Sequence, residues 1–77
     1  MAYYKYSTHL AQYNGEMFDK VHKPGDNVVY SGVYRCEVCG KEISHNASVP
    51  LPPQNHHQHD PGRGEIRWKM IVWAATN

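Results

Sequence analysis

Residues 33–43, with the sequence VYRCEVCGKEI, place both cysteines of the chain in a Cys-x-x-Cys turn between two β-prone segments. Valine and tyrosine before the turn and isoleucine after it favour extended strands. Gly40 follows Cys39 directly, and glycine adopts a positive φ without strain, so the chain can fold back at this point. The stretch therefore predicts a β-hairpin whose tip presents the Cys36 and Cys39 sulfurs to one point.

A second strand pattern lies near the other end of the chain, in the sequence IRWKMIVW at residues 66–73. Ile66, Trp68, Met70 and Val72 alternate with Arg67, Lys69, Ile71 and Trp73. Alternation with a period of two is typical of a strand with one buried face. We also expect residues 28–30, with the sequence VVY, to be extended, because β-branched and aromatic residues favour strands.

The segment before Pro24-Gly25 has a different, helical period. Apolar residues recur there at three- and four-residue spacing, and Pro24-Gly25 is a typical stop signal for a helix. Gly15 interrupts the pattern at a cost of about 1 kcal/mol relative to alanine. We therefore expect a short helix from Gly15 to His22, an N-terminal arm over residues 1–23, and one domain over residues 24–77.

Length and charge exclude several classes of protein. With 77 residues, the chain is too short for a two-layer α/β core with a cofactor crevice. A net charge of +1 argues against tight non-specific binding to duplex nucleic acid. The apolar run 70–75 is far shorter than the roughly 20 residues of a membrane-spanning helix, and the first residues do not resemble a signal peptide. We expect a cytoplasmic monomer without a membrane partner.

A long proline-rich loop separates the two strand patterns. Residues 44–64 contain four prolines, which are Pro50, Pro52, Pro53 and Pro61. A loop of this length in a small domain is usually functional or held by something. Three histidines crowd into residues 56–59, with the sequence HHQH, and imidazole together with thiolate is a typical ligand set for Zn²⁺.

The cysteine turn and the histidine cluster together predict a structural zinc site. His56 and His59 repeat the two-residue spacing of Cys36 and Cys39, so these four are the first choice of ligands. His57 paired with His59 is the alternative, and His45 can replace either histidine. A thiol–disulfide role for the cysteines is disfavoured, because such motifs begin a helix in a larger βαβ unit, whereas Gly40 follows at once.

The order of these segments resembles the zinc-ribbon or rubredoxin-like family. The matching parts are SGVYRCEVCGKEI, then LPP, a second ligand cluster and RWKM. The resemblance implies a small, mostly β fold of antiparallel hairpins, with Cys36 and Cys39 as the first ligand-bearing knuckle. Ribbons usually offer a second cysteine pair after the prolines, whereas this chain has Gln54 and then histidines from His56 onward. The chain also resembles a group of short, uncharacterised bacterial proteins.

A closed four-ligand site is structural, since catalytic zinc keeps one position open. We therefore expect an interaction module that binds a protein or single-stranded nucleic acid through an aromatic and basic face. That face would consist of Tyr34, Arg35, Arg67, Trp68 and Lys69. The alternatives are a small metal-dependent hydrolase or nuclease with a partly open zinc site, in which a free histidine acts as general base, and a metal-sensing protein.

Overall fold

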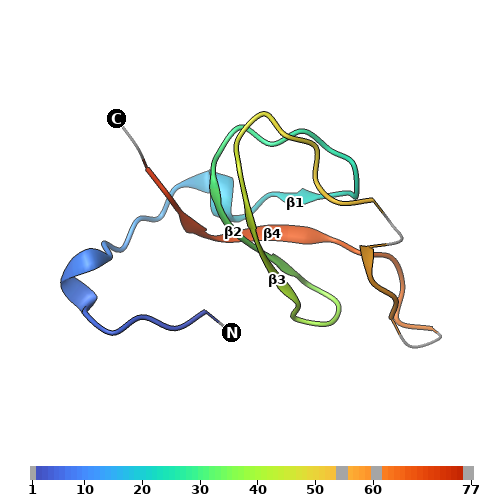
Figure 1. The fold of residues 1–77 in the computed structure, drawn as a ribbon, viewed down its shortest axis with the longest axis horizontal. Helices are drawn as coiled ribbons and strands as arrows, with labels where there is room; N and C mark the ends of the chain where they lie inside the picture. Colours follow the sequence, from blue (N-terminus) through green and yellow to red (C-terminus); the bar gives the residue numbers. More distant parts are fainter. Residues whose placement is uncertain (1, 54–55, 60–61, 76–77) are drawn as a thin grey trace.

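Four antiparallel strands form a single sheet at the centre of the molecule (Figure 1). The computed structural model describes residues 2–53, 56–59 and 62–75. The strands are β1 (Val21–His22), β2 (Gly32–Cys36), β3 (Glu42–His45) and β4 (Trp68–Trp73), in the order β1-β4-β2-β3. Two single 3-10 turns, η1 (Ser7–His9) and η2 (Glu16–Phe18), precede them. The prediction of a small, mostly β protein is confirmed.

The predicted cysteine hairpin is present as β2 and β3. The two strands pair from Gly32 opposite His45 to Arg35 opposite Glu42. The turn closes with the Gly40 amide donating to the Cys36 carbonyl at 2.8 Å. Gly40 has a φ of 81°, as expected, and this left-handed conformation lets the chain reverse after Cys39.

Strand β4 runs between β1 and β2, and its inward side chains confirm the alternation expected from the sequence up to Met70. Ile66, Trp68 and Met70 are buried. Beyond them the register shifts, because Met70 lies opposite Tyr34 and Val72 lies opposite Val33, which leaves Ile71 without an opposite residue. This β-bulge moves the later side chains off the strict alternation, so Val72 and Trp73 are both half-buried.

The core gathers around β2 and β4. Its buried members are Val28, Tyr34, Cys36, Leu51, Ile66, Trp68 and Met70. Gly32 lets β2 and β4 approach closely where β2 begins and β4 ends. A Cβ built on Gly32 would collide with the backbone carbonyl of Val72. The pairing of β2 with β4 therefore depends on a glycine at the first residue of β2, where another backbone approaches closely.

The helix expected from Gly15 to His22 is reduced to the single turn η2, and its last two residues form β1 instead. Val21 pairs with Lys69 and His22 pairs with Trp68, so hydrogen bonding to β4 prevails over the helical period. Gly15 is extended (φ −68°, ψ 147°), which prevents a helix from extending back through it. Consequently the sheet includes two residues from the segment expected to be an arm.

Residues 28–30, expected to be a strand, belong to no strand of the sheet. The Val28 side chain is buried, while the backbone around it pairs with the proline-rich segment through an isolated bridge between Asn27 and Pro50. The Leu51 amide donates to the Asp26 carbonyl at 2.8 Å. The described residues between β3 and β4 add no strand to the sheet, and Pro61 lies outside the described residues.

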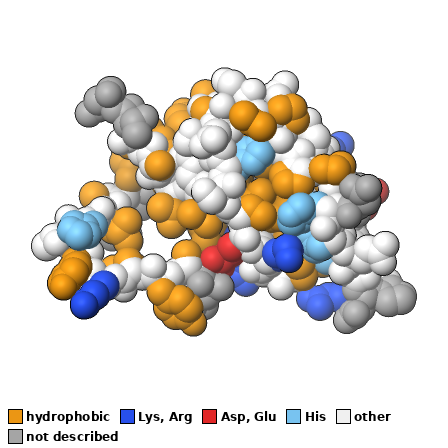
Figure 2. Space-filling model, viewed as in Figure 1, with side chains coloured by type: hydrophobic (Ala, Val, Ile, Leu, Met, Phe, Trp, Pro, Cys, Tyr) orange, Lys and Arg blue, Asp and Glu red, His pale blue; other side chains and the backbone are white. Residues whose placement is uncertain are grey.

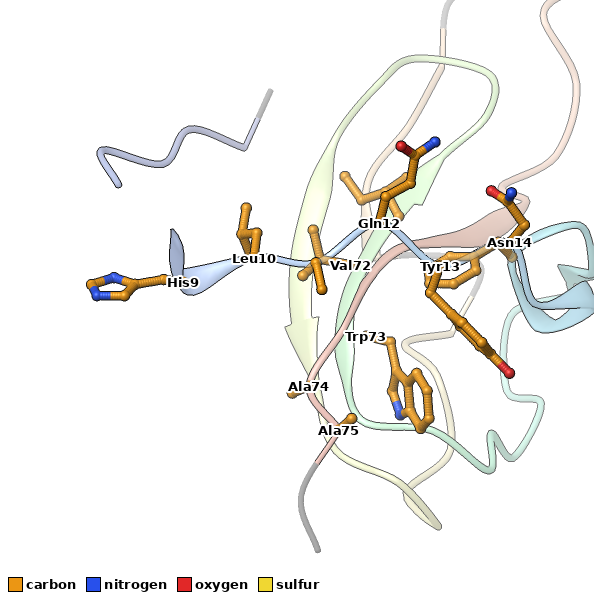
Figure 3. Close-up of a pocket in the computed structure, with 12 residues that line it drawn as sticks. His9, Leu10, Gln12, Tyr13, Asn14, Val72, Trp73, Ala74 and Ala75 are labelled. Carbon is orange, nitrogen blue, oxygen red and sulfur yellow. The ribbon is translucent and has the colours of Figure 1, made fainter. Parts of the chain in front are cut away.

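The N-terminal arm, residues 2–14, extends away from the sheet in Figure 1 and is exposed along its length. Tyr13 contacts Trp73, with ring centroids 5.7 Å apart. Between the arm and the end of β4 lies an open groove lined by Leu10, Tyr13, Val72 and Trp73 among others (Figure 3). Neither 3-10 turn in the described part of the chain is long or apolar enough to cross a bilayer.

Candidate metal centre

Two thiols and two imidazoles meet at one end of the sheet. The group consists of Cys36, Cys39, His57 and His59, and one ligand atom from each residue lies within 4.8 Å of all the others. Cys36 ends β2 and is buried, whereas Cys39 lies in the following turn and is exposed. In Figure 2, pale-blue histidine side chains reach the surface of the body of the molecule. Because Cys39 is exposed and His57 and His59 are half-buried, the candidate centre lies close to the surface.

Three ligand-atom separations within the group are at or slightly below those expected around a small tetrahedral ion. Cys36 Sγ lies 3.3 Å from His59 Nε2, and Cys39 Sγ lies 3.3 Å from His57 Nε2. The two Nε2 atoms are 3.1 Å apart. Zinc bound at about 2.3 Å from sulfur and about 2.0 Å from nitrogen would separate its ligand atoms by about 3.3 to 3.8 Å. The residues therefore fit a metal ion of this size and ligand preference.

Backbone and side-chain contacts orient the two histidines. His59 Nδ1 lies 2.8 Å from the Gly64 carbonyl oxygen, which only accepts, so Nδ1 carries the proton and Nε2 is free to bind. His57 Nδ1 lies 2.8 Å from His56 Nδ1. Ligating histidines typically hold their second nitrogen in this way.

Further contacts tie the chain between the histidines and β4 to the cysteine turn. The Arg63 guanidinium donates to the Val38 carbonyl at 2.7 Å, and the Glu37 amide donates to the Arg67 carbonyl at 2.8 Å. Val38 and Glu37 are the two residues between the cysteines. These bonds hold the cysteine turn against the residues that lead from the histidines into β4, independently of any ion.

The surroundings of Cys36 favour its thiolate. Burial opposes ionisation, but backbone hydrogen bonds from Arg67, Cys39 and Val38 and a side-chain hydrogen bond from His57 outweigh it and lower the pKa of Cys36 to about 6. Thiolate is the form of cysteine that binds metal. Desolvation, followed by the neighbouring charges of His57 and Lys41, lowers the pKa of His56, which keeps that imidazole neutral at pH 7.

The predicted ligands are distributed as follows. The structure brings together Cys36, Cys39 and His59, and the histidine that joins them is His57, the alternative, rather than His56. His45 lies at the end of β3, where its Nε2 donates to the Val49 carbonyl at 2.8 Å. In the described part of the chain no carboxylate belongs to the group, and Asp60 lies outside the described residues.

The expected aromatic and basic face does not form as a surface. Tyr34 and Trp68 are 1 % and 0 % exposed, because inward positions of β2 and β4 place both rings in the core. Arg35 and Arg67 are exposed, and half-buried Lys69 lies 3.7 Å from a carboxylate oxygen of Glu37. Tyr34 and Trp68 are therefore corrected from surface residues to core residues.

Trp68 links the core to the candidate centre. Its ring centroid lies 5.7 Å from those of both His56 and His57, in edge-to-face contacts. Cys36 lies opposite Trp68 in the sheet. Sequence analysis did not identify this role, nor those of Arg63 and Gly64, because a β-pattern tryptophan or a loop glycine carries no local indication of what it contacts.

Comparison with known proteins finds a relative in Escherichia coli. No family model and no solved structure matches the chain. The chain is similar to Protein L of Escherichia coli, with 57 % identity over 55 residues. The aligned region is 71 % of this chain and 62 % of Protein L, so the chain spans less than two thirds of that relative. The name states no activity or ligand, and a functional assignment therefore depends on the chemistry of the site.

Proposed function

We propose that the protein is a small zinc-binding module in which Cys36, Cys39, His57 and His59 hold one structural Zn²⁺. The observation that carries this proposal is the convergence of four ligand atoms within 4.8 Å from two segments that lie 18 or more residues apart. Zinc suits the donors, because it accepts thiolate and imidazole in a tetrahedral arrangement and undergoes no redox chemistry.

A structural role follows from the number of ligands. Four protein donors complete a tetrahedral shell, whereas a catalytic zinc needs a position for water or substrate. The chain's own residues then join the cysteine turn to the histidine segment and close the loop that begins after β3. Such a cross-link suits a small domain whose core is limited by its size.

The arrangement also supports a zinc-ribbon-like description in part. The β2–β3 hairpin with Cys36 and Cys39 at its tip corresponds to one ribbon knuckle. The second pair of ligands differs, since His57 and His59 lie in a segment outside the strands of the sheet. We propose a ribbon in which a loop of two histidines replaces the second hairpin.

We further propose that the protein is cytoplasmic and that it binds a protein partner through a surface that includes Arg35 and Arg67. Burial of Tyr34 and Trp68 removes the rings on which single-stranded bases would stack, while the two arginines stay accessible. Titration with a short oligothymidine tests this choice. We expect no change in tryptophan fluorescence at micromolar strand concentration, and saturable binding that falls steeply with salt would favour nucleic acid instead.

Native mass spectrometry of protein purified without added metal is the direct test of the zinc site. We expect one zinc per chain, and loss of that mass in Cys36→Ser and His57→Ala. His45→Ala is the matched control, since His45 lies outside the group of four, and it should retain zinc. A chain that takes up no metal, or that holds it equally well in the Cys36→Ser variant, would overturn the proposal.

A further inference from the structure

The third histidine of the cluster lies beside the candidate centre without joining it. His56 Nδ1 is 2.8 Å from His57 Nδ1, and the two rings meet edge to face with centroids 5.1 Å apart. A nitrogen–nitrogen contact of this length requires one proton shared between a donor and an acceptor. Which histidine donates decides whether His57 can bind a metal.

Only one direction of this hydrogen bond is compatible with metal binding. A neutral imidazole carries one proton, and a ligating Nε2 must offer its lone pair, so the proton of His57 must be on Nδ1. His57 then donates and His56 Nδ1 accepts. If His56 donated instead, His57 would carry its proton on Nε2, and that atom would not be a ligand.

From this geometry we infer that His56 is a positioning residue for the metal site, accepting a hydrogen bond that selects the binding tautomer of His57 and fixes the orientation of its ring. The inference rests on the proposed metal site. It gives adjacent His56 and His57 separate tasks, one orienting and one ligating.

The local backbone holds His56 in this position. Its amide donates to the Pro53 carbonyl at 2.9 Å. Its ring also lies against Trp68, which is buried at the start of β4. The acceptor nitrogen is therefore anchored both by the chain and by the core.

The matching contact on the other ligand supports the same logic. His59 Nδ1 donates to a backbone carbonyl, that of Gly64, so a fixed acceptor orients His59 as well. The two ligating histidines thus differ in how they are held, one by the main chain and one by a side chain. Only the acceptor of His57, the His56 side chain, can be removed by a substitution.

Two variants of His56 separate orientation from ligation. Asparagine places its side-chain oxygen close to where His56 holds Nδ1 and keeps an acceptor, whereas leucine fills similar space without one. We expect His56→Leu to weaken zinc affinity about tenfold. This is the lower end of the roughly 10- to 100-fold losses seen when a residue that orients a metal ligand is removed, because His56 is exposed. His56→Asn should stay within about threefold of the parent chain. His9→Leu, on the exposed arm, is the matched control and should change nothing.

Affinity is measured by competition with a chromophoric chelator, starting from zinc-loaded full-length protein. Cobalt substitution then reports the ligand set, and we expect the same thiolate and ligand-field bands in His56→Leu as in the parent. Nitrogen-15 NMR of the zinc-loaded parent chain should show His57 protonated at Nδ1 and His56 protonated at Nε2. This last measurement uses the parent chain alone, so it tests the inference even if His56→Leu folds poorly.

Three results would overturn it. The first is a His57 tautomer with its proton on Nε2, the second is equal affinity in the parent and both His56 variants, and the third is loss of a nitrogen ligand from the cobalt spectrum of His56→Leu. The third would make His56 a ligand. Failure of the parent chain to bind metal at all would instead refute the proposed function, so the two failures are distinguishable.

Discussion

The two tryptophans at the ends of β4 lie in contrasting surroundings. Trp68 is 0 % exposed and is covered by the histidine segment and by Cys36 across the sheet. Trp73 is only half-buried, and its ring contacts are with Tyr30 and with Tyr13 of the exposed arm. One end of the strand lies beside the candidate metal centre, and the other has aromatic contacts beside an open groove.

This difference shows how a small sheet can be held in two ways. At the Trp68 end, hydrogen bonds and a candidate metal shell hold a loop that has little apolar content of its own. At the Trp73 end, the sheet is held by the close approach of β2 and β4 at Gly32 and by the contacts of the Trp73 ring with Tyr13 and Tyr30. Changes at the Trp68 end should therefore cost much more stability than changes at the arm.

Metal removal should have the largest effect. A structural zinc contributes on the order of 10 kcal/mol in small zinc-binding peptides, so a strong chelator should abolish the β-sheet signal in circular dichroism and shift Trp68 fluorescence to the red. A Trp73→Phe background isolates the Trp68 emission. Full retention of the sheet after verified metal loss would show that the hydrogen bonds of Arg63 and Glu37 suffice.

Gly32→Val should have the next largest effect. Any side chain at this position meets the Val72 carbonyl, so β2 and β4 must separate, and we expect a loss of about 2 to 3 kcal/mol in chemical denaturation. Gly25→Ala is the control, because its Cβ would meet no atom within 4 Å and only the positive φ of 83° would cost stability. An equal loss in both variants would mean that the close approach is unimportant.

Tyr34→Phe should have a smaller effect. The hydroxyl donates to the Tyr30 carbonyl at 2.6 Å, and its removal should cost about 1 kcal/mol. Burial raises the pKa of Tyr34 above its usual value of 10.0, so the folded state keeps this proton after the unfolded chain has lost it. The contribution of Tyr34 to stability should therefore be constant below pH 10 and fall above it.

Absorbance titration of the phenolate checks this prediction. We expect a component that ionises above pH 10 in the parent chain and is absent from Tyr34→Phe. The variant should also show a weaker decline of stability at alkaline pH. A titration curve that differs only in total amplitude would contradict the assigned burial of the hydroxyl.

Tyr13→Ala should have the smallest effect, below about 0.5 kcal/mol, because exposed side chains rarely contribute more. Tyr13 is 58 % exposed and contacts β4 mainly through Trp73. Thermal unfolding of the zinc-loaded chain is the measurement. A loss comparable to that of Tyr34→Phe would show that the arm is part of the domain and would weaken the contrast between the two ends.

Sequence analysis predicted the elements with strong local patterns. The β2–β3 hairpin and β4 follow from alternation and from the Gly40 turn, and the structure contains both. The short strand β1 was missed, because two residues carry no usable period and Val21 lay within a helical one. The bulge at Ile71 was missed as well, since register between strands depends on the partner strand and not on local sequence.

Three of the four candidate ligands, Cys36, Cys39 and His59, were predicted from the sequence, since thiols and imidazoles in compact clusters are chemically distinctive. The choice between His56 and His57 was not. Both lie in the same four-residue run, and the direction of each ring depends on the hydrogen bond from the His56 amide to the Pro53 carbonyl and on the ring contacts with Trp68. Likewise, the burial of Tyr34 and Trp68 followed from which face of the sheet became the core.

By itself, the order of amino acids determined a small β-rich chain, a cysteine turn and a source of nitrogen ligands, because these depend on residue type and short spacing. Only the tertiary structure decided which histidine faces the sulfurs, which rings are buried and where the strands slip in register. Those features depend on contacts between segments that are distant along the chain, and local propensity carries no information about them.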